Sequence, residues 1–575
     1  MLNSRRYELQ GLLIIIGLLI SFRTYLSFNA GGPTCFPDEI LYRFNATAIF
    51  ELSKYGNAHY PPLYSLVISP ALFFQHWYQG MLVISSLFSS MVVPATWLLA
   101  RAVKVKNPLL PALISALLPM QAVYSQMLLS ENIGVPLFVL TVALALRGSR
   151  REAIGFGFML GLLHLTKYLY LPAVILLFVV WIVVHMGKGE DIDWLLKVRK
   201  TITASLMVLA AYIFVYGLWV CYGVGSGIPI NELFGFYITP ITRGRFSKSI
   251  SYNSFFLWST CYLSYIVIAW LPSWVLMATW CANKKVEFRM QCYNLERLAF
   301  IVTLFIMLVG YWLLAVQHSF GASYNYPNPH YLLGRYLMHL SPLIIILGVL
   351  IIENIQASVR KFNLVRTFLF VLIIVATAFL MRWVLFDGGI WKLPHWFADI
   401  PFNSIDAYQV GTTKVFVIFV LAIFAMLSIL IVLRNHILII VLPWIVVSGL
   451  ILFLATERNK STIPAVHAHE ISKFLMPIMS SLEKPVYIYV SGLTETVEDV
   501  RYGLEFWGVA SNDLIVEEID KSGGIINKRS FIVASNEMSY KLRYIYNLKE
   551  KKYFIYQSDV QESNVQLKKM IPQIL

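Results

Sequence analysis

Most of this chain consists of apolar stretches of about twenty residues, and their number constrains the fold more than any other feature. A stretch of that length can cross the hydrocarbon core of a membrane as one helix. The sequence is 58% hydrophobic and only 13% charged, with a mean hydropathy of +0.67, which excludes a soluble globular protein. We therefore predict an α-helical polytopic membrane protein.

About thirteen spans result when each predicted helix is given a length near twenty residues. The predicted spans are residues 11–28, 81–100, 109–124, 128–146, 156–168, 171–185, 202–222, 255–280, 300–316, 337–352, 367–385, 415–433 and 436–454. Loops rich in Lys and Arg alternate with loops that contain few, and cytoplasmic loops are the ones that carry such cations. We therefore expect a multi-pass protein of the plasma membrane whose longer, aromatic loops are extracytoplasmic.

The formal net charge of +15 follows from this topology signal, because the cations gather in the predicted cytoplasmic loops. We therefore expect no nucleic-acid partner. The five cysteines show no CxxC spacing, so they predict neither a disulfide framework nor a zinc site. A disulfide from Cys35 to Cys221 or Cys261 stays open.

The first predicted outer loop, residues 28–76, carries the acidic pair Asp38-Glu39. Carboxylates at a membrane boundary are costly to keep there, so the pair indicates a functional site. Apolar residues recur at helical spacing over 40–55, which predicts an amphipathic helix on the membrane surface. Asp38 also suits the N-cap of that helix. A Pro-Pro pair then interrupts the chain, and the apolar stretch after it is shorter than a span.

The composition becomes that of a soluble domain at about residue 456. Residues 485–490 and 530–535 have the pattern of buried strands, and residues 467–481 and 495–509 have a helical pattern. This order predicts a small α/β domain at residues 456–575, following a transmembrane domain at residues 1–455. The orientation of the spans makes this C-terminal domain extracytoplasmic.

Several short motifs occur along the transmembrane domain in a fixed order. They are Pro37-Asp38-Glu39, Tyr60-Pro61-Pro62-Leu63-Tyr64, Tyr124-Ser125, Ser130-Glu131-Asn132, Leu165-Thr166-Lys167 and Gly334-Arg335-Tyr336. In these motifs the chain resembles the membrane-embedded GT-C glycosyltransferases, particularly relatives of protein O-mannosyltransferases and lipid A aminoarabinose transferases. The resemblance implies a GT-C-like fold. It also implies an enzyme that moves one sugar from a polyprenyl-phosphate donor to a protein, lipid or glycan acceptor on the outer face, among membrane lipids.

The same resemblance implies that the aspartate of the first outer loop, here Asp38, is the catalytic base. An acceptor hydroxyl loses its proton as it attacks the anomeric carbon, so one positioned carboxylate suffices. Glu39 lies roughly 100° further around a helix, and we expect this second catalytic residue to orient the acceptor or a partner side chain. A single displacement with one base inverts the anomeric carbon.

The phosphate leaving group needs positive charge, which Arg supplies by bidentate contact and Lys as a point charge. The predicted substrate-binding residues are Tyr60, Glu131, Lys167, His330, Arg335 and Tyr336. Simpler interpretations exist for three of these positions: a snorkelling lysine at 167, an arginine of the aromatic belt at 335, and a helix cap at Ser130-Glu131.

Tyr60 marks a departure from the family pattern. The aminoarabinose transferases have a lysine before Pro-Pro, where this chain has Tyr60. The phosphate contact of that lysine would then come from Lys54, His59 or Lys167, and the sequence does not separate these three candidates.

Metal dependence stays open between no cofactor and Mg²⁺ or Mn²⁺. Asp38, Glu39 and Glu131 offer oxygen ligands of the kind these ions prefer, but no spacing requires an ion. Two other functions also stay open. A transporter or lipid flippase would place ionisable residues at mid-membrane, where Arg23 and Arg382 fall. An oligosaccharide polymerase or ligase would use a diphosphate-linked donor.

Overall fold

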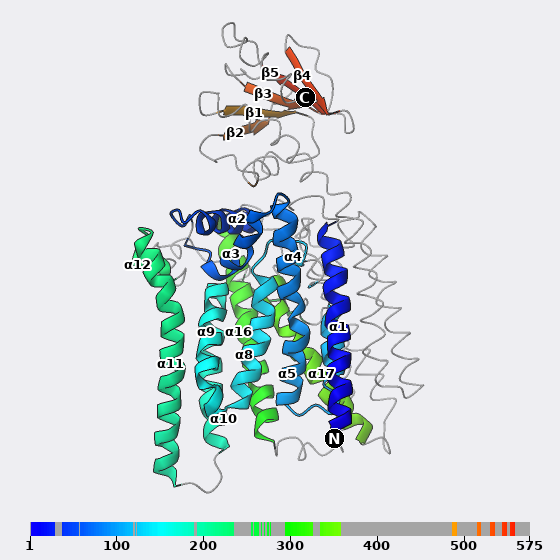
Figure 1. Ribbon diagram of the computed structural model, residues 1–575, viewed down its shortest axis with the longest axis vertical. Coiled ribbons are helices and arrows are strands. Elements are labelled where there is room, and N and C mark those ends of the chain that lie inside the picture. The colour runs from blue at the N-terminus through cyan, green and yellow to red at the C-terminus, as the bar shows by residue number, and fades with distance from the viewer. Residues whose placement is uncertain are drawn as a thin grey trace. The chain divides into compact units, whose positions relative to one another are not determined.

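The computed structural model describes most of the chain up to residue 357 and a five-stranded sheet beyond it (Figure 1). The described residues are 2–28, 37–56, 58–118, 121, 124–188, 193–234, parts of 255–277, 294–325, 334–357, 486–491, 506, 514–518, 530–534, 543–548 and 553–557. They fall into two compact units. A helical unit is formed by Met1–Phe28 with Asn45–Glu457, and a sheet unit by Asn29–Phe44 with Arg458–Leu575.

Among the described residues, five helices of the helical unit are long and apolar enough to cross a membrane. They are α1 (Leu2–Phe28), α4 with α5 (Trp77–Ser90 and Val92–Ala102), η3 with α10 (Tyr168–Tyr170 and Leu171–Gly187), α11 (Trp194–Gly225) and α16 (Leu295–Asn325). Each of them contains a stretch that the hydropathy predicts to span the membrane. The protein is therefore a helical, multi-pass membrane protein.

Shorter helices lie among these five. They are α3 (Pro62–Ile68), η1 (Ser69–Phe73), α6 (Leu109–Ala116), α8 (Glu131–Arg147), η2 (Arg150–Glu152), α9 (Ala153–Thr166), α12 (Ile230–Leu233), η6 (Gly334–Tyr336), η7 (Met338–Leu340) and α17 (Ser341–Ala357). Helix α6 ends before the predicted boundary at residue 124, since Leu118 precedes a proline, which disfavours helical geometry. The predicted spans after residue 366 lie outside the described residues, so the total of about thirteen stays a prediction.

Helix α2 (Pro37–Phe50) is the helix predicted in the first outer loop, but it is shorter than predicted. It ends before Leu52, which has a left-handed backbone with φ of 53°. The Ser53 N–H donates to the Ala48 carbonyl at 2.9 Å, and the Leu52 N–H donates to the Ile49 carbonyl at 3.2 Å. This is the hydrogen-bond pattern of a Schellman motif, which closes a helix and turns the chain.

Helices α9 and α11 pack closely along their lengths (Figure 1). A Cβ atom at Gly157 would collide with the Val208 carbonyl, and one at Gly161 would lie 2.7 Å from the Val215 Cβ. Small residues four positions apart let two membrane helices approach closely and gain dispersion contacts. The glycines of α9 therefore fix its position against α11.

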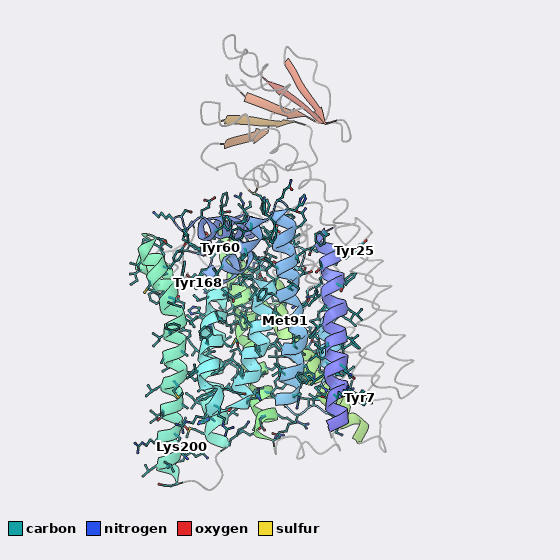
Figure 2. The ribbon with its side chains drawn as sticks, in the orientation of Figure 1. Tyr7, Tyr25, Tyr60, Met91, Tyr168 and Lys200 are labelled. Atoms are coloured by element: carbon teal, nitrogen blue, oxygen red, sulfur yellow. The ribbon has the colours of Figure 1, made fainter. Side chains whose placement is uncertain are left out.

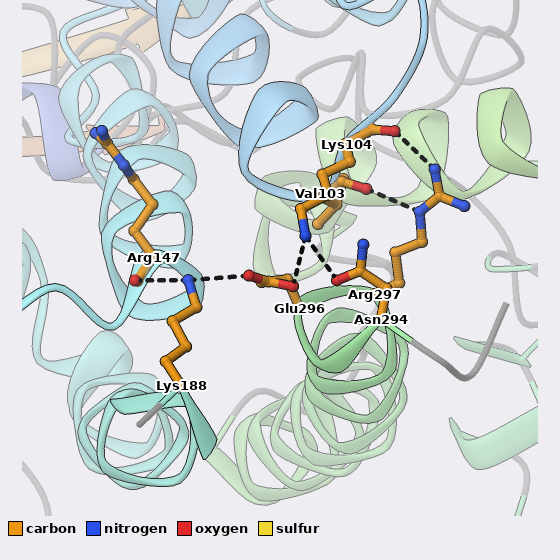
Figure 3. Close-up of polar contacts among 7 residues, drawn as sticks. All are labelled: Val103, Lys104, Arg147, Lys188, Asn294, Glu296 and Arg297. Atoms are coloured by element: carbon orange, nitrogen blue, oxygen red, sulfur yellow. Dashed lines mark hydrogen bonds and ion pairs between the residues drawn. The ribbon is translucent and has the colours of Figure 1, made fainter. Parts of the chain in front are cut away.

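Residues from four predicted cytoplasmic loops meet at one end of the helical unit, three of the loops through charged side chains and the loop of Arg147 through its backbone carbonyl (Figure 3). Glu296, at the start of α16, lies 3.2 Å from Lys104 Nζ and 3.0 Å from Lys188 Nζ. Lys188 also donates to the Arg147 carbonyl at 2.9 Å, and Arg297 donates to the Lys104 carbonyl at 2.6 Å. These contacts hold the segments after α5, α8 and α10 together with the start of α16.

The described strands form one sheet in the order β2-β1-β3-β5-β4. They are β1 (Val486–Ser491), β2 (Leu514–Glu518), β3 (Ser530–Ala534), β4 (Arg543–Leu548) and β5 (Tyr553–Gln557). Strand β1 pairs in parallel with β2 and β3, whereas β5 pairs antiparallel with β3 and β4. Strands β1 and β3 lie where the sequence predicts strands. The two predicted helices lie outside the described residues apart from Phe506, so the α/β domain stays a prediction.

The disulfide alternatives are only partly tested. Cys221 is exposed and free. Cys35 and Cys261 lie outside the described residues.

We expect the substitution Glu296→Gln to lower the free energy of unfolding by about 1 kcal/mol. It removes two partly exposed ion pairs, each of which contributes roughly 0.2–1 kcal/mol. Thermal unfolding of the purified protein in detergent measures the change. Glu152→Gln is a matched control because Glu152 pairs with Arg147 alone, at 3.0 Å. A loss for Glu296→Gln no larger than the control's would contradict the bridging role of Glu296.

Candidate active site

An ion pair between the start of α8 and the end of α9 forms the centre of the site. Glu131 is the first residue of α8, and Lys167 directly follows α9 with an extended backbone. Lys167 Nζ lies 2.6 Å from Glu131 Oε1, and the two side chains are 18% and 4% exposed. The Ser130 hydroxyl donates to Glu131 Oε2 at 3.3 Å, so both carboxylate oxygens have partners. A buried pair of this kind needs such contacts to offset its desolvation.

The helix-cap interpretation of Ser130 is wrong for its side chain. Ser130 stands at the N-cap position of α8, but its hydroxyl makes no capping hydrogen bond. The hydroxyl binds the neighbouring carboxylate instead. Glu131 itself still lies in the first helical turn, where the helix dipole favours a negative charge.

A second buried cation lies next to this pair. Arg335 and Tyr336 belong to the short helix η6, and Arg335 is only 8% exposed. Lys167 Nζ lies 5.3 Å from the centroid of the Tyr336 ring, and Arg335 Cζ lies 5.7 Å from the same centroid. Tyr336 also shares a hydrogen bond of 3.2 Å with His318 Nε2 on α16. One aromatic ring therefore contacts both cations, in the geometry of cation–π interactions.

An aromatic cage around His339 lies among the elements that carry Lys167, Arg335 and Tyr336. The rings of Phe138, Tyr170 and Tyr311 lie with their centroids 4.7, 5.4 and 4.1 Å from that of His339, which is 1% exposed. These residues come from α8, η3, η7 and α16, so the cage joins the elements that carry Lys167 and Arg335. A Cβ atom at Gly134 would lie 2.7 Å from the Tyr170 hydroxyl, so only glycine fits there.

The sequence analysis does not predict this cage. One spacing carries a signal for it: His339 follows Arg335 by four positions. Residues so spaced lie on one face of a helical turn.

Tyr168 connects the site to the loop after α11. Its hydroxyl lies 3.1 Å from the carbonyl oxygens of both Ala58 and Leu233. The Tyr216 hydroxyl donates to the same Leu233 carbonyl at 2.7 Å. Figure 2 shows Tyr168 and Tyr60 toward one end of the helical unit and Tyr7 and Lys200 toward the other. Glu131 begins α8 and Arg147, which Figure 3 draws, ends it, so the site lies at the end opposite those charges.

Asp38 and Glu39 lie in the first turn of α2. Because Pro37 begins the helix, Asp38 is inside it and does not occupy the N-cap. Asp38 is partly exposed, and Glu39 is fully buried. Both residues belong to the sheet unit, whereas Glu131, Lys167 and Arg335 belong to the helical unit. Their association in one site stays a prediction.

Tyr60 has its backbone fixed by a neighbouring tyrosine. The Tyr55 hydroxyl donates to the Tyr60 carbonyl at 2.7 Å, and burial raises the pKa of that hydroxyl well above its usual value. Lys54 and His59 are exposed. Of the three candidates for the phosphate contact, His59 contacts the ring of its neighbour Tyr60, with the centroids 5.5 Å apart. Lys167 contacts both Glu131 and Tyr336, which are distant in sequence. His330 lies outside the described residues.

No group of three potential metal ligands among His, Cys, Asp and Glu occurs in the part of the chain that the structure describes. The carboxylate of Glu131 is occupied by Lys167 and Ser130. Metal dependence therefore stays open between no cofactor and Mg²⁺ or Mn²⁺.

A scan against protein-family models finds no match, and neither does a search of curated proteins. Solved structures do match. ArnT from Cupriavidus metallidurans bound to undecaprenyl phosphate aligns over 96% of this chain and 98% of that chain, with a TM-score of 0.55 and 14% identity. The apo state of ArnT aligns over 95% and 98%, with a TM-score of 0.53 and 13% identity. The chain therefore shares the fold of these ArnT structures, which is the fold that its motifs predict.

Proposed function

We propose that this protein is an integral-membrane glycosyltransferase that moves a sugar from a polyprenyl-phosphate donor to an extracytoplasmic acceptor. The observation that carries the proposal is the buried Glu131–Lys167 pair beside Arg335 and Tyr336. Further support is the fold, because the ArnT structure that shares it holds undecaprenyl phosphate. The acceptor is a hydroxyl group of a protein, lipid or glycan.

Lys167 and Arg335 are the proposed ligands of the donor phosphate. When the bond between the anomeric carbon and the phosphate oxygen breaks, its electron pair goes to that oxygen, which gains negative charge. Cations held in a buried, low-dielectric site stabilise such a charge far better than cations in water. Glu131 holds Lys167 in place by the 2.6 Å contact, and Tyr336 lies against both cations.

Asp38 is the proposed base. It takes the proton of the acceptor hydroxyl while the hydroxyl oxygen forms its bond to the anomeric carbon, which inverts the configuration at that carbon. Glu39 is fully buried and is the proposed positioning residue beside it. Tyr60 and His330 complete the proposed substrate contacts.

The proposed orientation places the active site outside the cytoplasm. The cations of Figure 3 lie beside Arg147, the last residue of α8, whereas Glu131 is the first residue of that helix. Loops rich in Lys and Arg stay in the cytoplasm. We also propose that residues 456–575 form an extracytoplasmic α/β domain after a catalytic transmembrane domain at residues 1–455.

The substitution Asp38→Asn should lower the turnover number by about 10²- to 10⁴-fold, the usual contribution of a general base. Sugar release from a panel of polyprenyl-phosphate sugars to purified protein measures the turnover, and binding of undecaprenyl phosphate should stay at the wild-type level. Glu51→Gln, an exposed carboxylate just after the same helix, is the matched control. Unchanged transfer by Asp38→Asn would overturn the assignment of the base.

The Glu131–Lys167 pair should behave as a coupled unit. Either Glu131→Gln or Lys167→Met alone leaves a buried charge without its partner, and we expect each to destabilise the protein by about 2 kcal/mol or more. The double variant should recover most of that stability, since no lone charge remains, yet it should still bind the donor weakly. Thermal unfolding and the KM for the donor measure the two effects. Additive losses of stability would show that the pair is not coupled.

A further inference from the structure

Arg23 is a fully buried cation that the proposed mechanism does not use. It lies in α1, where Leu18, Phe22 and Tyr25 are exposed while Arg23 is 0% exposed. Its Nη1 donates to the hydroxyl of Ser89 on α4. Its Nε and Nη2 make no hydrogen bond to any described residue, and none of the ion pairs among the described residues includes it. Two charged donors are therefore left over in the interior.

Buried serines surround this arginine. The Ser27 hydroxyl donates to the Arg23 carbonyl at 2.9 Å and shares a second hydrogen bond of 2.9 Å with Ser86. Ser86 and Ser89 are three positions apart on α4, so both face α1. We call Arg23, Ser27, Ser86 and Ser89 the Arg23–serine cluster. Its four members are each 0% exposed.

The segment before α8, whose backbone contacts this cluster, contains two more buried donors. The Ser86 hydroxyl also contacts the Ser125 carbonyl at 3.4 Å. On the same turn, Gln121 Nε2 and the Tyr124 hydroxyl are buried and have no hydrogen-bond partner among the described residues. The turn is held by Asn132, whose amide donates to the Tyr124 carbonyl at 2.9 Å. The Gln121 amide and the Tyr124 hydroxyl therefore add to the buried donors that have no acceptor among the described residues.

This imbalance identifies the chemistry of a missing partner. A buried donor without an acceptor is unfavourable by roughly 1–3 kcal/mol, and by more when it is charged. The guanidinium group presents its donors as a planar fork that matches phosphate oxygens. An oxyanion would neutralise the charge and accept from the leftover donors together, which water alone does not do.

The position of the cluster also suits a phosphate group at the membrane. Arg23 lies five residues before the end of α1 at Phe28, about 7 Å below that end along the helix axis. The described residues from Tyr124 to Glu131 are all buried and connect the cluster to the candidate active site. The members of the Arg23–serine cluster are nevertheless distant in sequence from Lys167 and Arg335, and no contact described above joins them to either residue.

We propose that the Arg23–serine cluster is a second oxyanion-binding site, which takes a phosphate group. Its ligand is either the headgroup of a polyprenyl phosphate, a source that rests on the proposed function, or free phosphate. Arg23 supplies the charge and a bidentate contact through Nε and Nη2, and Gln121 and Tyr124, whose donors are unused, supply neutral contacts.

The test follows thermal unfolding of the purified full-length chain in detergent during titration with undecaprenyl phosphate or inorganic phosphate. We expect Arg23→Met to weaken the apparent affinity about tenfold or more. Arg6→Met removes an exposed arginine from the other end of the same helix and should leave the affinity unchanged. An Arg23-dependent shift with inorganic phosphate but not with undecaprenyl phosphate identifies free phosphate as the ligand.

Tyr124→Phe keeps the test decisive if Arg23→Met does not fold. This change removes a donor that has no partner, so the unliganded Tm should stay the same or rise while the phosphate-induced shift falls. A lower unliganded Tm with an unchanged shift would overturn the proposal. So would the absence of any shift in the wild type, or wild-type affinity in Arg23→Met.

Sugar transfer, measured in parallel, separates this proposal from the proposed function. Arg23-dependent binding in a chain that transfers no sugar leaves the second site standing and contradicts the glycosyltransferase. Full sugar transfer without Arg23-dependent binding supports the glycosyltransferase and contradicts the second site.

Discussion

Burying charge within a membrane protein is the constraint on which the site depends. The contact between Glu131 and Lys167 satisfies it by joining the first residue of one helix to the residue after another. Neither charge is stable there alone, so α8 and α9 must keep their relative position. The close approach of Tyr170 to Gly134 and the aromatic cage around His339 hold together the elements that carry this pair.

The two ends of the helical unit handle charge in different ways. At the end shown in Figure 3, Glu296 is shared by Lys104 and Lys188, whose side chains are 58% and 37% exposed, so water screens these contacts and each contributes little. At the other end Lys167 and Arg335 are largely withdrawn from water. Electrostatic interactions are therefore less screened at the end that holds Lys167 and Arg335.

Sequence patterns predict those parts of the fold that depend on local composition. Hydropathy predicts α10 and α11 because each must be apolar over its length, and motif order brings Glu131, Lys167, Arg335 and Tyr336 forward as site residues. Other features depend on contacts distant in sequence and leave no periodic signal. Helix α2 ends at a leucine with left-handed geometry, and the cage around His339 joins four separate elements. Strand β2 ends in two glutamates, which breaks the apolar run that predicts β1 and β3.

Helix α11 has 32 residues, so it is about 48 Å long, whereas the hydrocarbon core of a bilayer is only about 30 Å thick. It must tilt or extend beyond that core. Near its far end, Tyr216 holds the Leu233 carbonyl that also contacts Tyr168, the residue after Lys167. A change in membrane thickness that alters the tilt of α11 would thus move the backbone beside the buried lysine. The geometry of the site would then depend on the thickness of the bilayer.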